Sequence, residues 1–242
     1  ALPVLGLLLG LILWWLAVLL LSGWTPVIAE FSPHAAFEQL LIGLRSGVLI
    51  RHASASLLRV GVGLAIAVLL AVPLGLLLGL NRRLELTSSA AFQFIRMISP
   101  LSWMPIAVMV LGVGDLPVFF LLGVAALWPI LLTIISAVRN INPLYIKVAR
   151  SFAAEPLEIV SRIVLPAIWP NLMASIRVAV GLIWVVLVPA EMLGVSSGLG
   201  YLILDCRDRL AYGELTAVLL LIGAIGWALD SGLRILSRDG HA

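Results

Sequence analysis

The sequence predicts an all-α, polytopic membrane protein with about six transmembrane helices. Of its 242 residues, 62% are hydrophobic and only 11% are charged. A soluble globular domain has about 45–50% apolar and about 25% charged residues. Because so few charged groups could not cover so much apolar material in water, the composition excludes a water-soluble protein. The apolar residues also come in long uncharged runs, as membrane-spanning helices require.

Six segments are long and apolar enough to span a membrane. Crossing about 30 Å of hydrocarbon takes about 20 mostly apolar residues in a helix, since irregular backbone and open strands cannot face lipid. The segments are residues 2–22, 60–80, 94–112, 116–138, 170–193 and 215–236. Pro100 and Pro105 interrupt the third segment, and Arg177 and Glu191 lie within the fifth. No polar tail precedes the first segment, so we expect that part of the N-terminus is missing.

Two pairs of glycines within these segments have a four-residue spacing. Gly6 and Gly10 form one pair, and Gly75 and Gly79 form the other. Small residues at this spacing let membrane helices approach each other closely.

The lysines and arginines of the short loops predict the orientation, because cytoplasmic loops carry an excess of them. If the second predicted span ends in the cytoplasm, eight fall on the cytoplasmic side and four on the outer side, and both termini are cytoplasmic. The eight are Arg82, Arg83, Arg139, Lys147, Arg150, Arg162, Arg234 and Arg238, and the four are Arg45, Arg51, Arg207 and Arg209.

The largest predicted cytoplasmic segment is a loop over residues 140–169. Its charged residues are Lys147, Arg150, Glu155, Glu158 and Arg162, and apolar residues are mixed among them at roughly helical spacing. One interpretation is an amphipathic helix that lies on the membrane surface. The other is a docking element that presents an apolar knob in a charged frame to a cytoplasmic partner.

The sequence lacks the motifs of an enzyme. A P-loop needs Gly-Lys-Ser/Thr so that the lysine reaches the phosphates, but the single lysine, Lys147, lies between Ile146 and Val148. Neither H-E-x-x-H nor G-x-S-x-G occurs. One cysteine and three scattered histidines do not make a metal cluster. We therefore expect no catalytic residue, metal or cofactor in this chain, and no nucleic-acid partner.

The cytoplasmic loop resembles the E-A-A-x-x-x-G-x9-I-x-L-P signature of ABC importer permeases. Three positions differ, because Lys147 stands where the signature has Glu, Val148 at its first Ala, and Ala153 at its Gly. A salt bridge that the missing Glu would make is therefore not carried over. The residues that the resemblance assigns to an ATPase-coupling loop are Lys147, Ala149, Arg150, Ser151, Phe152, Ala153, Ala154, Glu155, Ile163, Leu165 and Pro166.

Three further segments resemble one branch of that superfamily, the nitrate, sulfonate, taurine and bicarbonate importers. They are residues 52–59 (HASASLLR), residues 94–96 (FIR) with 100–105 (PLSWMP), and residues 190–194 (AEMLG) running into 197–202 (SGLGYL). The resemblance covers nearly the whole chain beyond about residue 45.

The resemblance implies a type I ABC importer permease fold in one domain, residues 1–242, with a core over about residues 50–236. It implies a multi-pass permease of the bacterial inner membrane that carries a small anion such as nitrate, bicarbonate, or an aliphatic sulfonate or taurine. Two copies, as a homodimer, would form the pathway within the lipid. Separate cytoplasmic ATPase subunits would bind ATP and Mg, and a periplasmic or lipid-anchored binding protein would deliver the substrate. In such proteins a coupling helix enters a cleft of the ATPase, which maps here to about residues 145–158.

Four residues are candidates for the pathway. Arg96 would face the dimer axis, where an anion could meet it, or would snorkel to the cytoplasmic headgroups. Trp103, Met104 and Glu191 lie in segments that resemble the branch. An ionisable residue inside the membrane is often functional, but Glu191 could equally lie at the outer end of its span, within reach of water or an arginine.

Two other classes of protein remain as alternatives. One is a secondary carrier or channel that works without an ATPase. It would need two or more buried ionisable residues and an inverted repeat, whereas the sequence offers one plausible acid and no such repeat. The other is a structural membrane scaffold, which would not need the charged, proline-framed loop.

Overall fold

The computed structural model describes residues 2–23 and 26–239, and these residues form helices and no strands. The predicted all-α class is therefore confirmed. The elements in chain order are α1 (Leu2–Ser22), η1 (Pro26–Phe31), α2 (Pro33–Arg45), α3 (Val48–Leu80), α4 (Arg82–Arg96), η2 (Pro100–Trp103), α5 (Met104–Leu111), α6 (Asp115–Arg139), α7 (Pro143–Ser151), α8 (Pro156–Ile159), the π-helix η3 (Val160–Val164), α9 (Leu165–Gly194), α10 (Leu199–Asp208) and α11 (Tyr212–Asp239).

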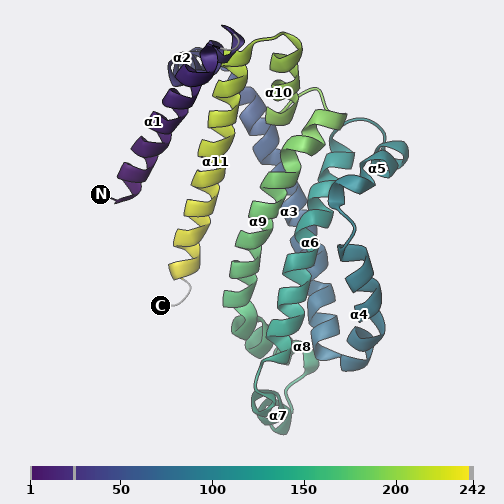
Figure 1. The fold of residues 1–242 in the computed structure, drawn as a ribbon. Coiled ribbons are helices and arrows are strands. Elements are labelled where there is room, and N and C mark those ends of the chain that lie inside the picture. The colour runs from purple at the N-terminus through teal and green to yellow at the C-terminus, as the bar shows by residue number, and fades with distance from the viewer. Residues whose placement is uncertain (1, 24–25, 240–242) are drawn as a thin grey trace. The chain divides into compact units, whose positions relative to one another are not determined.

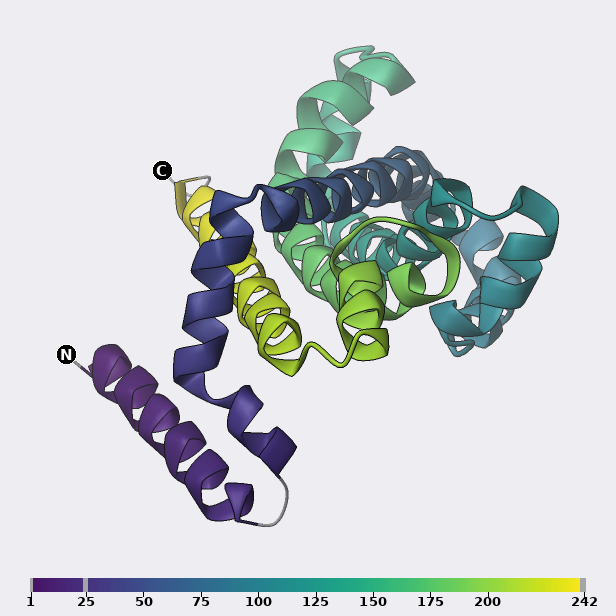
Figure 2. The same ribbon diagram turned by 90° about the horizontal axis from the view of Figure 1, so that it is seen from above.

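The chain divides into two compact units, and the divisions fall within α3, α9 and α11. Unit 1 comprises residues 1–57 and 191–227, and unit 2 comprises residues 58–190 and 228–242. In unit 1 the chain turns back through η1, so that α2 returns toward the start of α3 (Figure 2). In unit 2, α5 and α7 lie at opposite ends of α6 (Figure 1).

Four of the described helices are long and apolar enough to cross a membrane. They are Val48–Leu80, Asp115–Arg139, Pro156–Gly194 and Tyr212–Arg234. These helices contain most or all of the second, fourth, fifth and sixth predicted spans. The first predicted span is the helix α1, of which Leu9–Ser22 is the shorter apolar part.

The third predicted span, which Pro100 and Pro105 interrupt, is broken into two helical parts. Its residues divide between α4 and the η2–α5 segment, and the chain bends by 84° between them. Ser99 has φ −57° and ψ 132°, because the residue before a proline is pushed out of the α region. Pro100 and Pro105 then occupy early positions of η2 and α5, where a missing N–H costs nothing. The bent pair makes a fifth crossing only if both halves count together.

Within unit 2, α3 packs closely against α6. A Cβ atom added to Gly75 would lie 2.7 Å from the Ile134 side chain, and one added to Gly79 would lie 2.7 Å from that of Val138. These glycines therefore allow the close helix approach that their spacing predicts. Gly6 and Gly10 have no atom within 4 Å of such a Cβ, so this pair makes no close contact with the described residues.

Candidate functional sites

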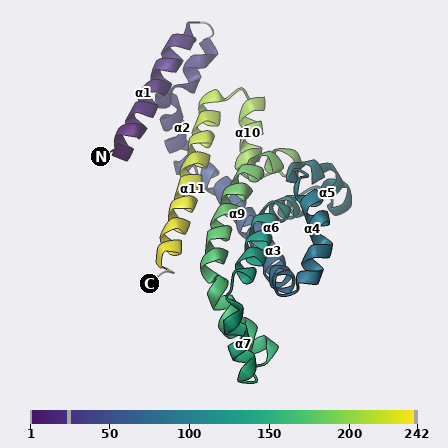
Figure 3. The same cartoon turned by 60° about the horizontal axis from the view of Figure 1, so that its bottom comes forward.

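The loop with the signature folds around the short helix α7. Asn142 caps its start, since its side-chain Oδ1 accepts the N–H of Leu144 at 2.9 Å. Pro143 takes the first helical position, where its fixed φ favours the helix. The α7 loop, defined as residues 142–158, projects from the end of α6 away from the other helices of unit 2 (Figure 3).

The expected single helix over residues 145–158 is wrong, because α7 ends at Ser151. Ala153 adopts the left-handed region with φ 57°. Its N–H donates to the carbonyl of Arg150 at 3.0 Å, and the N–H of Ala154 donates to that of Ala149 at 3.1 Å. This pair of bonds is a Schellman motif, whose left-handed position favours glycine. The left-handed backbone at Ala153 explains why the signature has Gly at this position, since glycine adopts a positive φ without steric cost.

The second helix of the α7 loop begins at Pro156. A proline is tolerated at the first position of a helix but would break a continuing one. The backbone N–H of Glu155 donates to Oε2 of Glu158 at 3.2 Å, which closes the start of α8. Backbone groups at the helix ends of the α7 loop therefore form hydrogen bonds with residues of the same loop.

The side chains of the α7 loop are largely exposed. Phe152 is 82% exposed and Leu157 76%. The charged residues Lys147, Arg150 and Glu155 are exposed beside them. The structure thus brings the predicted coupling residues 147–155 together on one projecting loop. Ile163, Leu165 and Pro166 lie apart from them, in η3 and the start of α9.

A buried polar cluster in unit 1 caps the start of α10. The N–H groups of Gly198, Leu199 and Gly200 each donate to a side chain: Nδ1 of His52 at 3.1 Å, Oγ of Ser56 at 2.8 Å and Oε2 of Glu191 at 2.8 Å. We call these six residues the capping cluster. The first N–H groups of a helix have no partner within it, so the side chains of the capping cluster supply hydrogen-bond acceptors for the N–H groups at the start of α10.

Glu191 is the centre of the capping cluster and is completely buried. Oγ of Ser56 lies 2.8 and 2.9 Å from its two carboxylate oxygens and donates to them. A buried carboxylate is stable where donors surround it, and the start of a helix favours negative charge. The segments 52–59 and 190–202, which resemble the branch separately in sequence, thus form one structural feature.

The other three pathway candidates lie in the segment that bends. Arg96 is the last residue of α4 and is exposed. Trp103 ends η2 and is half-buried, whereas Met104 begins α5 and is 4% exposed. These three residues belong to unit 2, whereas Glu191 belongs to unit 1.

Unit 2 contains two ion pairs that the sequence did not predict. Nε of Arg177 donates to Oδ1 of Asp230 at 2.8 Å, and Nη2 of Arg59 lies 2.7 Å from Oδ1 of Asp115. The partners are 53 and 56 residues apart in sequence. The sequence shows that these charged residues lie within or beside apolar runs, but it does not show which residue each of them pairs with.

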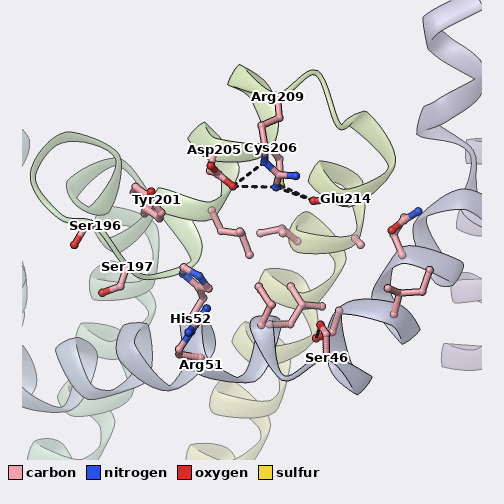
Figure 4. Close-up of a pocket in the computed structure, with 18 residues that line it drawn as sticks. Ser46, Arg51, His52, Ser196, Ser197, Tyr201, Asp205, Cys206, Arg209 and Glu214 are labelled. Carbon is pink, nitrogen blue, oxygen red and sulfur yellow. Dashed lines mark hydrogen bonds and ion pairs between the residues drawn. The ribbon is translucent and has the colours of Figure 1, made fainter.

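Unit 1 also contains a pocket of about 630 Å³. Its walls come from α2, the start of α3, the α9–α10 loop, α10 and the start of α11 (Figure 4). His52 of the capping cluster also lines this pocket, and its ring is nearly parallel to that of Tyr201, with 6.0 Å between the centroids.

Arg209, Asp205 and Glu214 form an ion-pair group on the pocket wall. A guanidinium nitrogen of Arg209 lies 2.9 Å from Oδ2 of Asp205, and Nη2 lies 2.8 Å from Oε2 of Glu214. Burial, together with the charge of Glu214, raises the pKa of the neighbouring Cys206 thiol to about 11. The thiol is therefore neutral at physiological pH and adds no charge to the wall.

Comparison with known proteins identifies relatives over almost the whole chain. The family model described as "Binding-protein-dependent transport system inner membrane component" matches residues 71–238. The bicarbonate transport system permease protein CmpB of Synechococcus elongatus is 34% identical over 98% of this chain and 88% of its own length. The taurine transport system permease protein TauC of Escherichia coli is 28% identical over 92% of this chain and 86% of its own length.

The fold also has a counterpart among solved structures. A chain of the MetNI methionine ABC transporter, solved in inward-facing conformations, matches with a TM-score of 0.68. The match covers 80% of this chain and 96% of that chain at 21% sequence identity. This likeness concerns the fold alone.

Proposed function

Because the chain belongs to the family of binding-protein-dependent transport system inner membrane components, we propose that it is the permease subunit of an ATP-driven importer for a small anion. The likeness to the MetNI chain confirms the predicted type I permease fold. Its relatives are named as permeases of transport systems, and the family is one of the inner membrane.

The α7 loop is the observation that carries the proposal. Its helix ends are closed locally, so the loop keeps its shape without support from the rest of unit 2. Phe152, in this loop, is 82% exposed. An exposed aromatic side chain in a charged frame is typical of an anchor for a protein partner. In the proposed complex the partner is a cytoplasmic ATPase subunit, and residues 140–169 are its coupling loop.

Coupling follows from a rigid-body change in two states. A homodimer of the single permease domain, residues 1–242, forms the pathway, and each copy presents one α7 loop to one ATPase. ATP and Mg bind to the ATPase pair, whose closure pushes the two loops together and opens the pathway outward. Hydrolysis resets the complex. Both termini of each copy lie in the cytoplasm.

The proposed substrate is a small anion such as nitrate, bicarbonate, or an aliphatic sulfonate or taurine. The relatives CmpB and TauC carry bicarbonate and taurine in their names, which supports this range. A periplasmic or lipid-anchored binding protein delivers the substrate. Arg96, Trp103 and Met104 remain candidates for the pathway itself, whereas the burial of Glu191 favours a structural role.

The test of coupling replaces Phe152 with Asp in the chain co-expressed with its ATPase. We expect the variant to lose the ATPase on purification, because a charge removes the apolar anchor from the cleft. Val113→Asp is the matched control, since Val113 is also 82% exposed but precedes α6, at the opposite end from α7. The readouts are the ratio of ATPase to permease in size-exclusion chromatography and ATP-driven uptake in proteoliposomes.

Two results would count against the proposal. One is that Phe152→Asp keeps both a full complement of ATPase and coupled uptake. The other is that the chain alone, in proteoliposomes without an ATPase, accumulates substrate under an ion gradient, which would identify a secondary carrier.

A further inference from the structure

The pocket in unit 1 has charged groups on opposite walls. Arg209, Asp205 and Glu214 lie on the wall formed by α10 and α11, whereas Arg51 and His52 lie on the facing wall formed by α3 (Figure 4). Its volume of about 630 Å³ falls within the range of about 300–1,000 Å³ that is usual for small-molecule sites.

Arg51 differs from Arg209 in its pairing. Arg209 is held between two carboxylates, but Arg51 forms no ion pair with any residue that the structure describes. Ser196 lines the pocket as well and is exposed. The α3 wall therefore offers a guanidinium with open donors, and a hydroxyl lies nearby in the α9–α10 loop.

His52 adds a polar side chain to the same wall. Its Nδ1 lies 3.1 Å from both the backbone nitrogen and the carbonyl oxygen of Gly198, so this ring nitrogen is held by Gly198. The same contact ties the α3 wall to the capping cluster. A ligand that binds His52 would therefore touch a residue that holds the start of α10.

The α10–α11 wall offers the opposite chemistry. Asp205 and Glu214 share one guanidinium, so each carboxylate keeps an oxygen that the Arg209 contacts do not use. These oxygens are acceptors for a cationic group. The side chains of Asp205 and Glu214 are 36% and 43% exposed, which keeps them accessible from the pocket.

The geometry points to a binding site for a small zwitterion, with its anionic group at Arg51 and its ammonium group at Asp205 and Glu214. A simple anion would use only the α3 wall and would meet two carboxylates across the pocket, and a simple cation would meet Arg51. A zwitterion matches both walls. That this pocket is a subsite of an importer rests on the proposed function, whereas the binding itself does not.

Direct binding to the purified full chain in nanodiscs tests the site. The probes are taurine, which carries a sulfonate and an ammonium group, and isethionate, in which a hydroxyl replaces the ammonium. We expect taurine to bind saturably in isothermal titration calorimetry, and isethionate at least about tenfold more weakly because it loses a charge-assisted contact.

Arg51→Gln should weaken taurine binding by at least about tenfold for the same reason. Arg45→Gln is the matched control, because Arg45 is an exposed arginine six residues away that does not line the pocket. Its affinity should stay within about twofold of the unchanged chain. Absent taurine binding, equal binding of isethionate, or equal losses in the two variants would each overturn the proposal.

A phospholipid headgroup with an ammonium and a phosphate presents the same chemistry as a free zwitterion. The titration is therefore run in nanodiscs of phosphatidylglycerol alone and in nanodiscs that also contain phosphatidylethanolamine. Weaker taurine binding in the second set would identify the headgroup as a competing occupant of the zwitterion site. Equal binding would identify a site for the free molecule. Because no ATPase is present, this result is independent of the coupling experiment.

Discussion

The capping cluster and the α7 loop close their helix ends in opposite ways. In the capping cluster, the N–H groups of α10 bind side chains as far as 146 residues away, and every partner is buried. In the α7 loop, the helix ends bind residues two to five positions away, and Phe152 and Leu157 stay exposed. The start of α10, which is bonded by side chains from α3 and α9, links these helices to one another. A segment that is locally complete leaves its side chains available to a partner.

The largest effect should come from removing the centre of the capping cluster. Glu191→Ala leaves the Ser56 hydroxyl and the Gly200 N–H buried without their acceptor. We expect the free energy of unfolding in detergent to fall by about 3 kcal/mol. Glu38→Ala is the control, because Glu38 is exposed on α2 and its loss should change stability by no more than about 0.5 kcal/mol. Equal effects of the two variants would remove the distinction between the regions.

A smaller loss is expected at Ser56, which both donates to Glu191 and accepts from the Leu199 N–H. Ser56→Ala should lower the free energy of unfolding by about 1.5 kcal/mol. Ser54→Ala, two residues earlier on the same helix, removes only an exposed hydroxyl that donates to the Arg51 carbonyl. Its effect should stay within about 0.5 kcal/mol. Denaturant titration of the two variants side by side makes the measurement, and similar losses would contradict the cluster.

In the α7 loop, a substitution should stabilise rather than destabilise. Ala153→Gly relieves a left-handed φ of 57° and should raise the free energy of unfolding of the loop by about 0.5–1 kcal/mol. Ala154→Gly, at the next position and without a positive φ, should lower it by about 0.5 kcal/mol. Hydrogen exchange of the loop amides measures both changes. A gain from Ala154→Gly, or none from Ala153→Gly, would contradict the Schellman motif.

The smallest effect on stability is expected at Phe152. Phe152→Ala removes a side chain that is 82% exposed, so the isolated chain should change its free energy of unfolding by no more than about 0.5 kcal/mol. The same variant should lose most of its ATPase on co-purification. A stability loss as large as that of Ser56→Ala would mean that Phe152 packs within the chain, and the contrast between the two regions would fail.

Local patterns predicted much of the fold and part of the sites. The apolar runs identified the long helices, because a 20-residue apolar helix is a property of consecutive residues. The structure has α7 and α8 within the predicted loop over residues 140–169, and the ends of these helices close within the loop itself. The resemblance also singled out Glu191, but sequence could not show that its carboxylate binds Ser56 and the start of α10.

The bend near Pro100 shows a second limit of the sequence. Hydropathy favoured one span over residues 94–112, although the prolines within it were visible. Proline marks a possible break, but whether the chain bends by 84° depends on what the two halves pack against.

By itself the sequence determined that this protein belongs in a membrane, that it is helical, and where its charged loop lies. These are properties of composition and of residues a few positions apart. Only the tertiary structure decided that Glu191 caps α10, that Arg177 pairs with Asp230, and that Arg51 faces two carboxylates across a pocket. Each of these relations joins residues on different helices, and only the link between Glu191 and Gly200 is short in sequence. That link requires the α9–α10 loop to fold back, and no periodicity along the chain reports such a turn.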